Sequence, residues 1–335
     1  MTDNADLPKK MFALRIEEFQ ADPPYVLRDD VKIPGPPRPD QVLIEIYSAG
    51  YCHTEMVANG DFEHMSRSPL PMIPSHEPTG VVVALGDNAK KLAPGGPSAP
   101  NRPLRVGDRV GALLFAHYCG KCDDCEDGRV RFCDNKDMLG VTYDGAFAQY
   151  MLADYRSVPL FCAGATIYSA IKACNLERGE HVCIMGAGAL GHIGVQLAKA
   201  LDLKVSTVDT RDPPLELVKG LRLAPDAVAN IKDVKASDKE RVKKLAEELG
   251  GAPDAVIVAT DAIPAFELAL ELVKKHGLMM VVGQPAEPIP VSYLHVIFKG
   301  VTVKGSLLAD ARTCKEMVDL VSQSSPRSRT IEEME

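Results

Sequence analysis

A run of glycines between two apolar segments most strongly constrains how this chain can fold. In "HVCIMGAGALGHIGVQLAKAL", residues 181–201, a short apolar strand leads into the glycines and a helical pattern follows them. The apolar segments "LKVSTVD", "AVIVAT" and "GLMMVVG" come later and alternate with helical patterns. Alternation of strand and helix is typical of a doubly wound parallel sheet. We therefore expect an α/β domain of the Rossmann type in the second half of the chain.

The glycines of this run have the G-x-G-x-x-G spacing of dinucleotide-binding loops. Gly186 would permit the tight turn, Gly188 the approach of a pyrophosphate to the backbone, and Gly191 the packing of helix on sheet. Ala189 and Leu190 would complete the loop at the start of a helix, whose N-terminus attracts phosphate. The alternative is an ordinary tight turn between a strand and a helix.

The residues after the next strand indicate which dinucleotide would bind. Asp209 stands where a carboxylate can accept hydrogen bonds from both ribose hydroxyls and repel a 2′-phosphate. This arrangement favours NAD over NADP as the cofactor. Arg211, two residues later, leaves NADP open as an alternative.

An amphipathic helix is predicted further along the same domain. In "SDKERVKKLAEELGG", residues 237–251, Ser237 and Glu240 have the spacing of a capping box. Apolar residues recur on one face, and two glycines follow the last of them. We expect a helix that begins after Ser237 and turns its charged face to solvent.

The size and composition of the chain exclude several classes of protein. Its 335 residues exceed what one core usually supports, so we expect two domains. The formal charge of −8 argues against nucleic acid or an anionic membrane as a partner. The N-terminus lacks the apolar core of a signal peptide, and no segment reaches the roughly 18 apolar residues of a membrane span. We therefore expect a cytoplasmic protein whose thiols stay reduced.

The first half of the chain has a different pattern from the second. It is rich in proline, in glycine and in short alternating runs such as "QVLIEIYSAGY" and "TGVVVALG", which turn residues separate. Runs of this kind predict a β-rich domain with many loops.

Four cysteines are grouped in one short segment of this first half, "YCGKCDDCEDGRVRFC". They are Cys119, Cys122, Cys125 and Cys133. Four thiolates at this spacing satisfy Zn²⁺ completely, which predicts a structural metal site with no open position for substrate. An iron–sulfur centre is one alternative, and four unrelated buried thiols are another.

A second group of metal-ligand residue types is scattered along the chain. Cys52 lies in "GYCHTE", His76 and Glu77 lie in "PSHEPTG", and Cys162 lies in "FCAGATIYSAIKA". Sulfur, imidazole and carboxylate together suit a zinc ion with one exchangeable position, which is the arrangement of a catalytic metal. Because these residues are distant in sequence, separate packing roles remain the alternative.

The assembled motifs resemble those of a known enzyme family. "GYCHTE", "PSHEPTG", "VGDRVG", "YCGKCDDC", "GAFAQY", "CAGATIYSAIKA", "GAGALGH" and "VDTRD" occur in the order found in zinc-dependent alcohol dehydrogenases of the medium-chain dehydrogenase/reductase family, of the yeast and bacterial tetrameric type. The resemblance implies a β-rich, GroES-like catalytic domain at residues 1–163, to which residues 304–335 return, and an NAD-binding Rossmann domain at 164–303. It also implies a homo-oligomer, either a dimer or a tetramer.

The resemblance assigns a role to each matching position. Two zinc ions per chain and NAD are implied. The catalytic zinc would be held by Cys52, His76 and Cys162, with Glu77 beside it, and the structural zinc by Cys119, Cys122, Cys125 and Cys133. Thr54 resembles the hydroxyl that takes the alcohol proton, and His53 the residue that meets the cofactor pyrophosphate. The cofactor-binding residues would be His53, Gly186, Gly188, Ala189, Leu190, Gly191, Asp209 and Arg211.

The implied activity is the reversible oxidation of primary and secondary alcohols to aldehydes and ketones, by hydride transfer from a zinc-bound alkoxide to NAD. One alternative is a polyol or secondary-metabolite carbonyl reductase on the same scaffold. Another is a protein that binds NAD and zinc without turnover.

The sequence departs from the family pattern at several positions, and two of these departures, Val57 and the early end of the sequence, motivate the non-catalytic alternative. Val57 replaces a second histidine of the proton relay, and Ala311 stands where an arginine commonly meets the cofactor. Ser75 precedes the His-Glu pair where glycine is usual. The family pattern also continues for roughly two dozen residues beyond the end of this sequence.

Overall fold

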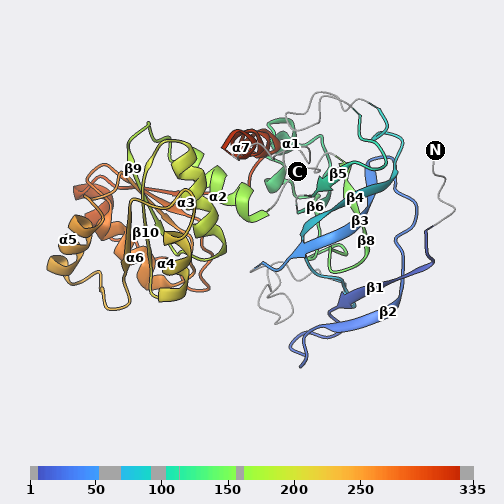
Figure 1. The fold of residues 1–335 in the computed structure, drawn as a ribbon, viewed down its shortest axis with the longest axis horizontal. Coiled ribbons are helices and arrows are strands. Elements are labelled where there is room, and N and C mark those ends of the chain that lie inside the picture. The colour runs from blue at the N-terminus through green and yellow to red at the C-terminus, as the bar shows by residue number, and fades with distance from the viewer. Residues whose placement is uncertain (1–6, 53–68, 92–102, 113, 156–161, 325–335) are drawn as a thin grey trace, which may run out of the picture. The chain divides into compact units, whose positions relative to one another are not determined.

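The computed structural model describes residues 7–52, 69–91, 103–112, 114–155 and 162–324. Within helices, nothing is described of the side chains at positions 162, 311, 322 and 324. Contacts divide the chain into two units, Met1–Cys162 with Asp310–Lys315, and Ala163–Ala309 with Glu316–Glu335. Each unit is considered by itself below, and Figure 1 labels their elements.

The first unit is built from antiparallel strands, as the alternating runs predict. A hairpin pairs β1 (Lys10–Arg15) with β2 (Val26–Lys32). A four-stranded sheet has the order β5 (Arg109–Gly111), β4 (Glu77–Leu85), β3 (Gln41–Gly50) and β8 (Tyr150–Asp154). In β4 every second residue is buried, because one face of the sheet covers a core that includes Val42, Ile44 and Val82.

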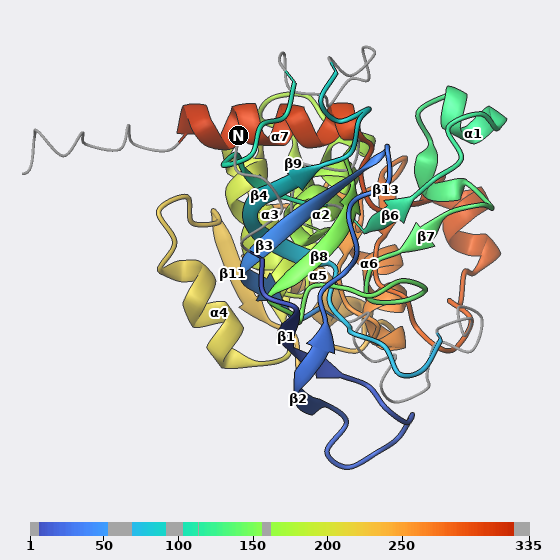
Figure 2. The same cartoon turned by 90° about the vertical axis from the view of Figure 1, so that its right-hand side faces the viewer.

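A small subdomain of the first unit carries the cysteine-rich segment. Here β6 (Phe115–His117) pairs with β7 (Asp137–Met138), and the segment between them contains α1 (Asp123–Glu126) and a 3₁₀ turn, Val130–Phe132. These elements lie together in Figure 2. The segment is too short and too polar to bury a hydrophobic core of its own. Segments of this kind are often stabilised by a bound metal instead of a core.

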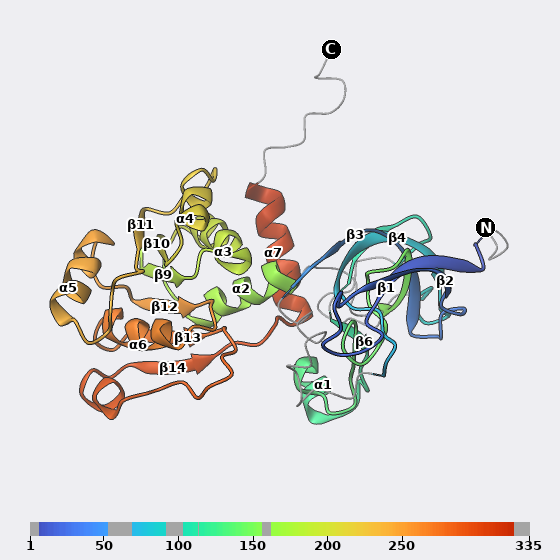
Figure 3. The same cartoon turned by 90° about the horizontal axis from the view of Figure 1, so that it is seen from below.

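The second unit confirms the expected doubly wound parallel sheet. Its six strands have the order β11 (Ala227–Asn230), β10 (Lys204–Asp209), β9 (His181–Met185), β12 (Ala255–Val258), β13 (Leu278–Val281) and β14 (Thr302–Gly305). Every residue of β9 and β12 is buried, as strands covered on both faces require. The chain order reverses between β9 and β12, and doubly wound sheets bind ligands at the carboxyl ends of such strands. Figure 3 shows β12, β13 and β14 side by side.

Helices precede, connect and follow these strands. They are α2 (Cys162–Ala173), α3 (Ala189–Ala200), α4 (Asp212–Lys219), α5 (Lys239–Glu248) and α6 (Ile263–Leu272), followed after the sheet by α7 (Ala311–Ser324). Among the residues that the structure describes, none of the helices is both long and apolar enough to cross a membrane.

The predicted amphipathic helix begins one residue later than the capping-box spacing indicates. The N-cap of α5 is Asp238 rather than Ser237, and its carboxylate accepts a hydrogen bond from the backbone N–H of Arg241 at 3.0 Å. A carboxylate at this position also interacts favourably with the helix dipole, which explains why Asp238 is used. The predicted apolar face is confirmed, since Val242 and Leu245 are buried.

The environment of His181, the first residue of β9, indicates how the stability of the second unit changes as the pH is lowered. The side chain is buried, and its Nε2 lies 2.8 Å from the hydroxyl oxygen of Ser206. Burial, and then the charge of Lys204, lower the pKa of His181 from 6.5 to about 4. The unfolded chain therefore takes up this proton at a higher pH than the folded chain. We expect the free energy of unfolding to fall by about 3 kcal/mol as the pH is lowered through this interval.

Urea unfolding of the His181→Gln variant beside the original protein would measure this effect. Glutamine can keep a polar partner for Ser206 but cannot take up the proton. Because both proteins share every other acid-sensitive group, the difference between their pH dependences isolates His181. Identical pH dependences would contradict the prediction.

Candidate functional site

The four clustered cysteines converge on one point in the first unit. The sulfurs of Cys119, Cys122, Cys125 and Cys133 all lie within 4.8 Å of one another. Cys133 Sγ is 3.6 Å from Cys119 Sγ, which is 3.9 Å from Cys125 Sγ. Four sulfurs bound to one zinc ion stand about 3.8 Å apart, the edge of a tetrahedron with Zn–S distances near 2.3 Å. The donor set and its spacing therefore fit a single tetrahedral ion.

Local backbone and ion-pair contacts hold this segment in shape. The guanidinium of Arg129 lies 2.9 Å from carboxylate oxygens of both Asp124 and Asp127. The backbone N–H of Lys121 lowers the pKa of the Cys119 thiol to about 6, whereas burial raises the pKa of the Cys125 thiol to about 12. A bound cation would supply the charge that ionises Cys125, because metals deprotonate their thiol ligands.

The structure also brings together three of the scattered candidates. Sγ of Cys52 lies 3.4 Å from Nε2 of His76, and a carboxylate oxygen of Glu77 lies within 4.8 Å of both atoms. A sulfur and a nitrogen bound to one tetrahedral zinc are about 3.6 Å apart. His76 is almost completely buried, whereas Cys52 and Glu77 are partly exposed. The donors fit a zinc ion that solvent can reach.

The pairing of β3 with β4 produces this convergence. Gly50, the last residue of β3, is opposite Glu77, the first residue of β4. Cys52 follows β3 by two residues and His76 directly precedes β4, so the strand register places both at one corner of the sheet. A Cβ at Gly50 would collide with the carboxylate of Glu77, so a larger residue there would displace that carboxylate from the site.

Ser75 strengthens the same corner. Its φ is +78°, in the left-handed region that favours glycine, and its hydroxyl donates a hydrogen bond to the carbonyl oxygen of Gly50 at 2.8 Å. The strained backbone costs about 1–2 kcal/mol, and this hydrogen bond offsets part of it. Serine at this position thus ties the segment before His76 to the end of β3.

Several predicted residues cannot be placed at this site. His53, Thr54 and Val57 lie outside the described residues. Cys162 begins α2, but its side chain is not described. The side chain of Ala311, the first residue of α7, is not described either. Their roles stay predictions.

The glycine loop in the second unit joins β9 to α3. Gly186 has φ +101°, and a Cβ there would lie 2.8 Å from the carbonyl oxygen of Ala259. Gly188 is the N-cap of α3 and faces open space, so a ligand can approach its backbone. A Cβ at Gly191 would collide with the carbonyl oxygen of Gly186. Ala189 and Leu190 form the first turn of α3, and the whole arrangement fits a dinucleotide.

Asp209 ends β10 beside this loop and is 6% exposed. Its Oδ2 accepts a hydrogen bond from the N–H of Ala187 at 2.9 Å. Although burial raises it, the pKa of Asp209 is below its usual value because Arg211 and the N–H groups of Ala187 and Arg211 donate to the carboxylate. The sequence analysis missed the direct pairing of Arg211 with Asp209. Their i, i+2 spacing could have indicated it, since residues two apart in extended chain share a face.

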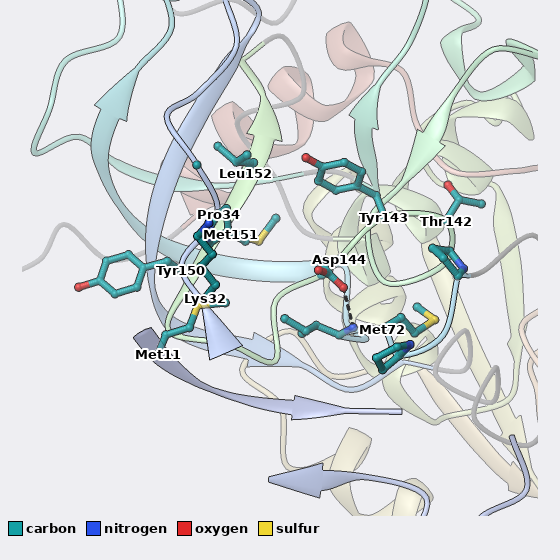
Figure 4. Close-up of a pocket in the computed structure, with 15 residues that line it drawn as sticks. Met11, Lys32, Pro34, Met72, Thr142, Tyr143, Asp144, Tyr150, Met151 and Leu152 are labelled. Atoms are coloured by element: carbon teal, nitrogen blue, oxygen red, sulfur yellow. Dashed lines mark hydrogen bonds between the residues drawn. The ribbon is translucent and has the colours of Figure 1, made fainter. Parts of the chain in front are cut away.

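A separate cavity of about 360 Å³ lies in the first unit (Figure 4). Met11, Lys32, Tyr143 and Asp144 are among the residues that line it. The carboxylate of Asp144 accepts a hydrogen bond from the N–H of Ile73 at 2.9 Å, drawn as a dashed line in Figure 4. Asp144 therefore supports the segment that leads to His76.

Both units of the chain match families of known proteins. Residues 38–161 match the alcohol dehydrogenase GroES-like domain, and residues 189–323 match the zinc-binding dehydrogenase family. An alcohol dehydrogenase from Geobacillus stearothermophilus is 33% identical over 302 residues, covering 86% of this chain and 83% of the relative. One from Rhizobium meliloti is 32% identical over 327 residues, covering 93% of this chain and 88% of the relative.

A solved structure agrees with these sequence relatives. The alcohol dehydrogenase from Aeropyrum pernix superposes with a TM-score of 0.79 at 27% identity, covering 93% of this chain and 90% of that one. The predicted GroES-like and Rossmann fold class is thereby confirmed. This chain belongs to the zinc-binding alcohol dehydrogenases of the medium-chain dehydrogenase/reductase family.

Proposed function

We propose that this zinc alcohol dehydrogenase uses two zinc ions per chain and NAD to oxidise small primary or secondary alcohols reversibly to aldehydes or ketones. The observation that carries the proposal is the approach of Cys52 Sγ to His76 Nε2, at 3.4 Å, with the Glu77 carboxylate beside them. Residues that are 24 apart in sequence meet here at the separation that a shared zinc requires.

In this proposal Cys52, His76 and Cys162 would hold the catalytic zinc, and the alcohol would bind beside them. When bound, zinc would lower the pKa of a coordinated hydroxyl from its very high ordinary value to about 7. Thr54 Oγ1 accepts the alcohol proton. Because Val57 stands in place of a relay histidine, that proton would continue to solvent through the cofactor ribose and water. Glu77 would stand beside the metal as a further carboxylate donor.

The second unit positions the cofactor. The N-terminus of α3 and the open backbone at Gly188 would receive the pyrophosphate, with His53 as a further contact. Asp209 would accept hydrogen bonds from the ribose hydroxyls. The nicotinamide ring supplies the hydride acceptor, so the task of the protein is to hold that ring against the alcohol carbon.

The four-cysteine site would hold the second, structural zinc. Two of its sulfur separations, 3.6 and 3.9 Å, suit one ion. A cluster of several irons and sulfides would hold the cysteine sulfurs farther apart. Thiolate ligands also require a reducing compartment, in keeping with a cytoplasmic location.

A panel of alcohols tests the proposed function. Ethanol, benzyl alcohol and cyclohexanol would each be mixed with purified protein and NAD, and the formation of NADH followed by absorbance. We expect NADH with at least one of them. Protein that carries two zinc ions and binds NAD, yet turns over none of the panel, would contradict the proposal and support the non-catalytic alternative.

We also propose that the exposed edge of the parallel sheet forms the homo-oligomer contact. Beside the edge strand β14, the π-helix Leu294–Phe298 exposes Ile297 and Phe298 by 70% and 73%. Apolar surface grouped in this way is typical of protein interfaces. We expect Ile297→Asp to lower the sedimentation coefficient, and Leu217→Asp, which changes a lone exposed leucine of α4, to leave it unchanged.

A further inference from the structure

We infer that Arg211 determines how strictly this enzyme distinguishes NAD from NADP. Arg211 neutralises Asp209, the acid that should exclude a 2′-phosphate. The guanidinium of Arg211 is also available to bind a 2′-phosphate. The inference rests on the proposed dinucleotide site at the loop between β9 and α3. It predicts that NADP binds measurably, with a weaker preference for NAD than Asp209 alone would impose.

The hydrogen bonds of Asp209 carry the first step of the argument. Oδ1 accepts from the backbone N–H of Arg211 at 2.9 Å and from its Nε at 3.2 Å. Oδ2 accepts from the N–H of Ala187 at 2.9 Å and lies 3.5 Å from Nη2 of Arg211. A carboxylate has about four acceptor sites, so donors of the protein itself already occupy those of Asp209.

The ribose hydroxyls of NAD would compete with Arg211 for the carboxylate of Asp209. The two backbone N–H groups belong to the β9–α3 loop and to the turn between β10 and α4, which hold them in place. The guanidinium is the partner that can move, since the Arg211 side chain is 66% exposed. Ribose hydroxyls must therefore displace Arg211 or share the carboxylate with it, which reduces the advantage that Asp209 gives to NAD.

The consequence for NADP is the opposite. A lone buried carboxylate would repel a 2′-phosphate, whereas the pair of Asp209 with Arg211 carries no net charge. An arginine side chain can turn from the carboxylate to a phosphate, because its planar donors match both groups.

Binding of two small nucleotides tests the inference without turnover. 5′-AMP and adenosine 2′,5′-bisphosphate would be titrated calorimetrically into zinc-loaded protein, because they differ at the 2′-phosphate that Arg211 would meet. We expect Arg211→Gln to weaken binding of the bisphosphate by about tenfold or more and to leave AMP binding unchanged or tighter. Arg211→Lys keeps the charge but loses the planar fork, so its effect should be intermediate.

A control variant shows whether the effect is specific. Arg178→Gln removes another exposed arginine of the same unit, one that pairs with Asp202. It should change neither affinity. Equal weakening of both nucleotides by Arg211→Gln, or no weakening of either, would overturn the inference. If the unaltered protein binds NAD and AMP but not the bisphosphate, the inference also fails while the cofactor site stands. If it binds none of them, the proposed cofactor site fails as well.

Discussion

Replacing His76 with alanine should remove one of the two zinc ions proposed per chain and lower kcat/KM for alcohol oxidation by about a thousandfold or more. His76 is 1% exposed and its Nε2 is 3.4 Å from Cys52 Sγ, so the protein holds this donor in place and alanine supplies no donor there. Without this ligand, the remaining donors cannot keep the metal that acidifies the alcohol. Metal analysis and steady-state kinetics with NAD would measure both effects.

A matched control separates this loss from misfolding. Cys174→Ala changes a buried thiol that donates to the carbonyl oxygen of Ala170 and belongs to neither proposed zinc site. We expect it to keep both zinc ions and its activity within about threefold, since it removes one weak hydrogen bond from the second unit. AMP binding should be unchanged in His76→Ala. A His76→Ala protein with two zinc ions and full activity would show that the catalytic metal is not held here.

Replacing Cys125 with serine should have the second largest effect, this time on stability. We expect the protein to lose its other zinc ion and the first unit to unfold about 10 °C or more below its original midpoint. The reason is that α1 and the adjoining 3₁₀ turn contribute no buried residue, so the proposed metal would replace the core that this segment lacks. Calorimetry and zinc analysis would measure these changes.

The control for this prediction lies in the same short helix. Asp123→Ser changes an exposed residue of α1 outside the four-cysteine set, and both zinc content and midpoint should be close to those of the unaltered protein. Iron and inorganic sulfide in the unaltered protein would contradict the zinc assignment and favour an iron–sulfur centre. Full stability of metal-free Cys125→Ser would show that the metal has no structural role.

Parts of the fold could be predicted because they depend on local geometry. Gly186 and Gly191 are required by the backbone of the turn itself, where any Cβ would press against a nearby carbonyl oxygen. The buried face of α5 follows from helical periodicity. Helix boundaries were less accurate, as Asp238 shows, because neighbouring polar residues compete for the same capping position.

The amino-acid sequence by itself determined the α/β class of the second unit, the glycine loop and the closeness of the four cysteines. The first follows from the alternation of strand and helix patterns, and the other two from residues that stand close together in the chain. The meeting of Cys52 with His76 was decided by tertiary structure, since it depends on the register of β3 against β4. So was the saturation of Asp209, whose Oδ2 accepts from Ala187 across 22 residues. Contacts between distant segments depend on how strands pair in the folded chain, and spacing along the sequence does not encode that pairing.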